Sequence, residues 1–122
     1  MTSLSDTAET RQAIIDACRW MINRGINQGT SGNISVRVAD GMLITPSGIP
    51  YDALQPDMIV LMPIEQDPDL TGRLKPSSEW RFHQTLMRTR QDRQVLVHAT
   101  PPRDGCSQAG PAGSYAQKLV TA

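Results

Sequence analysis

Apolar residues recur at intervals of three and four residues near the start of the chain, which is the spacing of one helical face. The pattern predicts a helix over 6–23. Asp6 and Glu9 have the spacing of a capping box at its start, and Gly25 is a suitable stop. The residues expected on the buried face are Ile14, Ile15, Cys18, Met21 and Ile22.

Strict alternation of apolar and polar residues follows from Asn33 to Val38 and predicts a strand. The pair Asp40–Gly41 is typical of a hairpin turn and would lead into a second strand. Two short apolar runs further along predict two more strands. The four predicted strands cover 33–38, 42–45, 58–62 and 95–97.

A second helix is predicted over 77–90, with Phe82, Leu86 and Met87 facing inward. Basic residues close to its end suit the helix dipole. The order helix, hairpin, strand, helix, strand indicates a mixed α/β layered fold.

The composition narrows the possible classes of protein. The 122 residues correspond to about one domain, and 12 Lys and Arg balance 12 Asp and Glu. This balance argues against a nucleic-acid partner. The absence of a long apolar run argues against a membrane span, and no secretory signal is visible at the start. With only two cysteines, we expect a cytoplasmic protein with reduced thiols.

The composition changes at Ala99. Six of the last 24 residues are Gly or Pro, against 12 of the first 98, and the only large aliphatic residues among the last 24 are Leu119 and Val120. Such a segment buries too little apolar surface to offset its ordering entropy. We therefore expect a folded part over 1–98 and a disordered tail over 99–122.

Two segments rich in glycine and hydroxyl groups could bind an anion. In segment 29–33, Thr30 lies between two glycines and Asn33 follows the second. Consecutive backbone N–H groups in such a turn can form an anion nest. Segment 45–48 ends in Ser47 and Gly48 and could continue the same site. Each segment, taken alone, is also typical of an ordinary turn.

Two further segments carry groups that could act in catalysis. Ser77 and Ser78 can cap the second helix and attract a phosphate, and Glu79 beside them could move a proton; the three are also a common helix start. His98 follows an apolar strand, where a histidine can be a metal ligand, an acid/base or a structural residue. His83 is interpreted as structural, because Glu79 and one histidine are too few ligands for a metal.

Together these segments resemble the class II aldolase/adducin family, and its sugar-phosphate aldolases, in particular the fuculose-phosphate aldolases, most closely. The resemblance covers about 8–98 and keeps the family's order and spacing. It implies a three-layer α/β/α domain with a largely antiparallel sheet, here truncated. The matching stretches are 25–37, 43–51, 75–83 and 95–98.

The resemblance also implies an activity and roles for individual residues. The family's aldolases cleave a phosphorylated sugar to dihydroxyacetone phosphate and an aldehyde, with a divalent zinc ion as Lewis acid, and are usually homo-tetramers. Glu79 would be the catalytic acid/base. His98 would be the first of three zinc-binding histidines, with Glu79 beside it. The residues expected around the substrate phosphate are Thr30, Asn33, Ser47, Gly48, Ser77 and Ser78.

The sequence departs from the family after Ala99. Thr100 stands where the second zinc histidine belongs, and no third histidine follows. The break coincides with the change in composition, which we interpret as an N-terminal part of the domain followed by an unrelated sequence, such as a frameshift produces. We expect this chain to bind zinc poorly and to be inactive. Alternatives are a sugar-phosphate epimerase or dehydratase of the same fold, or a non-catalytic module like the adducin head.

Overall fold

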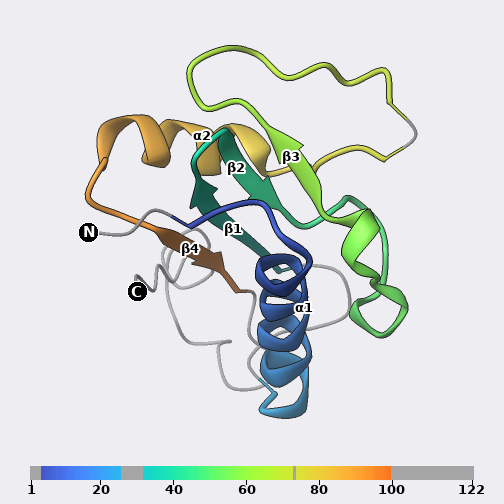
Figure 1. Ribbon diagram of the computed structural model, residues 1–122. Helices are drawn as coiled ribbons and strands as arrows, with labels where there is room; N and C mark the ends of the chain where they lie inside the picture. Colours follow the sequence, from blue (N-terminus) through green and yellow to red (C-terminus); the bar gives the residue numbers. More distant parts are fainter. Residues whose placement is uncertain (1–3, 26–31, 73, 100–122) are drawn as a thin grey trace, which may run out of the picture.

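Four antiparallel strands form a sheet with one helix on each face (Figure 1). The computed structural model describes residues 4–25, 32–72 and 74–99. The strand order is β3-β2-β1-β4. The elements are α1 (Ala8–Asn23), β1 (Asn33–Val38), β2 (Gly41–Ile44), β3 (Val60–Met62), α2 (Trp80–Thr89) and β4 (Val95–His98).

The β1–β2 hairpin forms where alternation and the Asp40–Gly41 pair predicted it. Val38 pairs with Gly41, and Ser35 pairs with Ile44 further along the hairpin. Even-numbered β1 residues face α1, and odd-numbered ones face α2, as the strand period of two requires. The hairpin therefore contributes side chains to the core on both faces of the sheet.

The α1 layer is apolar. The helix buries the residues predicted from their spacing, except that Ile22 is only partly buried. The predicted capping box is wrong: Thr7 is the N-cap, and its hydroxyl accepts a hydrogen bond from the Thr10 amide at 3.1 Å. Asp6 instead forms a salt bridge with Arg11, whose Nε lies 2.6 Å from the Asp6 carboxylate.

The α2 layer mixes apolar and polar groups. Met87 is fully buried, whereas Phe82 and Leu86, predicted to face inward, are half-buried. The helix begins at Trp80, three residues later than predicted, because Ser77 and Ser78 form the turn before it. On this face β1 presents the polar side chains of Asn33, Ser35 and Arg37.

Two short 3-10 helices, Tyr51–Ala53 and Pro56–Met58, connect β2 to β3. The strand predicted over 58–62 therefore starts only at Val60. The guanidinium of Arg11 donates to the carbonyl oxygens of Pro56 and Ile59 at 2.9 and 2.8 Å, and so holds this segment against α1. This contact between distant residues explains why the segment before Val60 is not a strand, although its apolar residues predict one.

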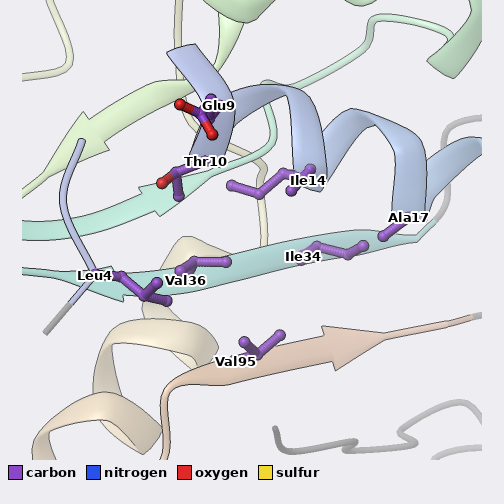
Figure 2. Close-up of a pocket in the computed structure, with 9 residues that line it drawn as sticks. Leu4, Glu9, Thr10, Ile14, Ala17, Ile34, Val36 and Val95 are labelled. Atoms are coloured by element: carbon purple, nitrogen blue, oxygen red, sulfur yellow. The ribbon is translucent and has the colours of Figure 1, made fainter. Parts of the chain in front are cut away.

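The three-layer arrangement with an antiparallel sheet is confirmed. Ala99, assigned to the tail from the sequence, is buried beside the α1 layer, and the rest of the predicted tail, 100–122, lies outside the described residues. An apolar hollow of about 380 Å³ lies between α1, β1 and β4, with Leu4, Ile14 and Val95 on its walls (Figure 2). Neither helix in the described part is long and apolar enough to cross a membrane.

Candidate functional site

Two of the hydroxyl-rich segments are joined by backbone hydrogen bonds. The Ser77 amide donates to the Thr45 carbonyl at 2.8 Å, and the Ser47 amide donates to the Lys75 carbonyl at 2.9 Å. Pro46 and Pro76 form the isolated bridge between these two contacts. The structure therefore brings segments 45–48 and 76–79 together, although about 30 residues separate them in the sequence.

The last residues of the other two segments, Asn33 and His98, lie at the same end of the sheet. Asn33, the first residue of β1, is the register partner of His98, the last residue of β4. The Thr45 amide donates to the Ile34 carbonyl at 3.1 Å, which ties the end of β2 to the start of β1. Thr30 lies outside the described residues.

The candidate phosphate-binding residues differ in how they present their donors. Ser47, Gly48 and Ser78 are exposed, and Gly48 has φ +74°, which favours glycine at this turn. Ser77 is buried, and its hydroxyl oxygen accepts a hydrogen bond from the Glu79 amide at 3.2 Å, so its own hydrogen remains to be donated. The amides of Ser47 and Ser77 are engaged by carbonyl groups, so an anion here would meet mainly hydroxyl groups.

Glu79 and His98 lie next to each other. A carboxylate oxygen of Glu79 is 3.7 Å from His98 Nδ1, with the Glu79 side chain 43% exposed and the His98 side chain 8% exposed. Both ring nitrogens of His98 are buried and have no hydrogen-bond partner among the described residues. Buried polar atoms normally have a partner, so this imidazole is prepared for a group that binds nitrogen.

These two side chains fit part of a zinc site. Imidazole nitrogen and carboxylate oxygen are both zinc ligands, but a catalytic zinc site has three protein ligands. Within the described residues, no three His, Cys, Asp or Glu side chains come together as a metal site would require. The described residues therefore do not complete a metal centre.

His83 lies fully buried beside this site. Ser35 Oγ is 2.6 Å from His83 Nδ1, and His83 Nε2 bonds to the side-chain oxygen of Asn33. Burial, reinforced by the nearby His98, lowers the pKa of His83 from 6.5 to about 4. These bonds agree with the sequence interpretation of His83 as structural. The sequence analysis did not predict the bond to Asn33. The alternating polar residues of β1 were the signal that a polar partner would be needed on this face.

Residues 12–104 match the family described as the class II aldolase and adducin N-terminal domain. The chain belongs to the class II aldolase/adducin family. The part that matches contains all four strands of the described sheet and α2, and it includes Glu79 and His98.

Individual relatives are aldolases of phosphorylated sugars. The chain is 51% identical over 85 residues to L-fuculose phosphate aldolase of Escherichia coli, covering 70% of this chain and 39% of the relative. It is 46% identical over 92 residues to 5-methylthioribulose-1-phosphate/5-deoxyribulose-1-phosphate aldolase of Rhodospirillum rubrum, covering 75% and 41%. The class II aldolase/adducin chain thus spans about 40% of the length of the curated relatives it matches.

Solved structures give the same family and fold. An L-fuculose 1-phosphate aldolase superposes with a TM-score of 0.71 at 32% identity, covering 78% of this chain and 45% of that chain. L-fuculose-1-phosphate aldolase of Thermus thermophilus gives 0.65 at 30% identity, covering 75% and 46%. The three-layer fold of this class II aldolase/adducin chain is therefore that of the solved aldolases over its described part.

Proposed function

We propose that this chain carries the phosphate-binding and proton-transfer part of a zinc-dependent sugar-phosphate aldolase, whose products are dihydroxyacetone phosphate and an aldehyde. The observation that carries the proposal is that segments 45–48 and 76–79 lie together with Asn33 and His98 at one end of the sheet. There, hydroxyl-bearing turns around Ser47 and Ser77 lie next to a carboxylate that is 3.7 Å from His98. The names of the relatives support the substrate class.

The phosphate group would bind at the turns before α2. The exposed hydroxyl groups of Ser47 and Ser78 can donate to phosphate oxygens, and the N-terminus of α2 favours negative charge. The full set proposed to surround the phosphate is Thr30, Asn33, Ser47, Gly48, Ser77 and Ser78.

Glu79 would be the acid/base. Its carboxylate is partly exposed, so it can reach a substrate held at the neighbouring turns. In the cleavage direction it would return a proton to the carbon atom left when the carbon–carbon bond breaks; in the reverse direction it would remove that proton. His98 and Glu79 would hold zinc, which when bound supplies the Lewis acid of such a reaction. Because they are only two of the ligands needed, no step is assigned to a metal on this chain.

A non-catalytic binding module, like the adducin head, is the second candidate. The observation that favours it is that only two metal donors meet within the described residues. An epimerase or dehydratase would use the same phosphate site. A homo-tetramer and a cytoplasmic location remain predictions from the sequence.

Titration with dihydroxyacetone phosphate, followed by amide chemical shifts of the labelled chain, tests the phosphate site. We expect the amide signals of segments 45–48 and 76–79 to move, and unphosphorylated dihydroxyacetone to leave them in place. The variant S47A/S78A should weaken binding by about thirtyfold, since each of the two lost hydroxyl donors to a charged oxygen contributes roughly 1 kcal/mol.

Thr85→Ala is the matched control, because Thr85 is an exposed hydroxyl residue in the middle of α2. It should bind like the parent. An unchanged affinity in S47A/S78A would contradict the phosphate site, and no binding by the parent would favour the non-catalytic module.

A further inference from the structure

His83 connects three parts of the candidate site from inside the protein. It follows Glu79 by one helical turn, and its amide donates to the Glu79 carbonyl at 3.3 Å. Its ring bonds to Asn33 and Ser35 of β1. The Phe82 ring lies 5.9 Å from the His83 ring and 5.5 Å from the His98 ring, so His83 and His98 have a common neighbour.

The hydrogen-bond partners determine which nitrogen of His83 carries the proton. The side-chain oxygen of Asn33 can only accept, so His83 Nε2 must donate. The ring is fully buried and its two nitrogens face the neutral side chains of Ser35 and Asn33, so it is neutral near pH 7. A neutral imidazole with a proton on Nε2 has an acceptor at Nδ1, and the Ser35 hydroxyl therefore donates to it at 2.6 Å.

In the structure the Asn33 carboxamide is turned with its oxygen towards His83. With its oxygen bound to His83, the side chain has only its two N–H hydrogens left to offer. These hydrogens suit a phosphate, whereas the opposite orientation would present an oxygen and repel it. Asn33 itself is buried, and it lies at the start of β1, where it pairs with His98.

We propose that His83 is a positioning residue that, together with Ser35, orients the Asn33 carboxamide so that its N–H group faces the substrate phosphate. The proposal rests on the proposed function, since it deepens the role given to Asn33 in the phosphate site. His83 and Ser35 are both 0% exposed, so neither touches the substrate and both act through Asn33.

The first test needs no ligand. Long-range proton–nitrogen NMR of the chain labelled at histidine reports the tautomer, and we expect His83 to hold its proton on Nε2 at about pH 7. A proton on Nδ1, or a charged imidazolium at that pH, would overturn the assignment. This outcome is independent of whether any phosphate ester binds.

The second test measures whether Ser35 and His83 affect ligand binding. Ser35→Ala removes the donor to Nδ1 without altering any residue proposed to touch phosphate, and we expect the Kd for dihydroxyacetone phosphate to rise about fivefold. His83→Leu should raise it further, and His83→Gln, which keeps an N–H donor, should recover part of the affinity.

Ile15→Val is the matched control, because Ile15 is fully buried on the opposite face of the sheet. It should lower stability and leave the Kd unchanged. If Ser35→Ala lowers stability but binds like the parent, His83 has only a structural role and the proposal fails. If the parent itself does not bind dihydroxyacetone phosphate, the proposed function fails instead, whatever tautomer is observed.

Discussion

At the scale of single residues, Gly41 shows how one position decides strand pairing. Its φ is +149°, and a Cβ atom added to it would lie 2.3 Å from the carbonyl oxygen of Met62. Only glycine lets β2 begin this close to the end of β3. The same residue that predicted a hairpin turn from the sequence is therefore also needed for a strand contact 21 positions away.

Gly41→Ala should lower the free energy of unfolding by roughly 2 kcal/mol, because it combines an unfavourable φ with a backbone clash. Urea denaturation measures this. Gly72→Ala is the control: Gly72 has no such φ, and the nearest contact of an added Cβ would be 3.8 Å away. An equal effect of the two substitutions would contradict the close approach at Gly41.

Cys18 gives a second prediction at this scale. Burial in the α1 layer raises the pKa of its thiol to about 12, and the thiolate is the reactive form. In a Cys106→Ser chain we expect no alkylation by iodoacetamide at about pH 8 until urea unfolds the protein. Alkylation of Cys18 at the rate of a free thiol without urea would mean that the α1 layer opens readily.

At the scale of elements, polar side chains fasten α2 to β1. The Arg37 guanidinium donates to the carbonyls of Met87 at 2.7 Å and Arg93 at 3.0 Å, at the C-terminal end of the helix. Near its other end, His83 binds Ser35 and Asn33. Directional bonds at both ends fix the helix more narrowly than apolar packing alone, and so fix where Glu79 lies.

The buried His83 makes the attachment of α2 sensitive to pH. Its pKa is lowered from 6.5 to about 4, so the unfolded chain takes up a proton before the folded chain does. The stability that the neutral ring contributes is present above pH 6.5 and is lost as the pH falls towards 4. The full loss corresponds to about 3 kcal/mol.

Urea unfolding at a series of pH values measures this dependence. His83→Gln removes the titrating ring, so its free energy of unfolding should fall much less over the same range. A parallel decline in parent and variant would contradict the assignment to His83.

At the scale of the whole molecule, the described fold contains an apolar hollow beside α1. Its lining includes Ile14, Ile34 and Val36, which are themselves buried core residues. The chain spans about 40% of the length of its curated relatives. The turns before α2 that are proposed to bind phosphate, the Glu79 carboxylate and His98 lie within the described residues.

Zinc binding is the prediction that depends on the whole chain. His98 and Glu79 are two donors, and affinity falls by orders of magnitude when a third protein ligand is missing. We expect the purified 122-residue chain to contain far less than one zinc per molecule by elemental analysis, and not to cleave fuculose phosphate. Near-stoichiometric zinc that is lost in His98→Ala would show that a further ligand is supplied.

The sequence by itself determined the elements, the three layers and the family. Apolar spacing reports burial directly, so the face of α1, the alternation of β1 and the hairpin at Asp40–Gly41 could all be predicted from neighbouring residues. Among the predicted borders that were wrong, the starts of α1 and α2 depend on local turns and caps. The start of β3 follows a segment that Arg11 holds from a distance through Pro56.

Only the tertiary structure decided how the site is arranged. The register of β1 with β4 places Asn33 opposite His98, and α2 brings Glu79 within 3.7 Å of that histidine. The contact of His83 with Asn33 joins residues 50 positions apart. Local periodicity tells which side chains are buried, but hydrogen bonds between buried polar groups depend on distance and direction. These are set only when the sheet and both helices have packed together.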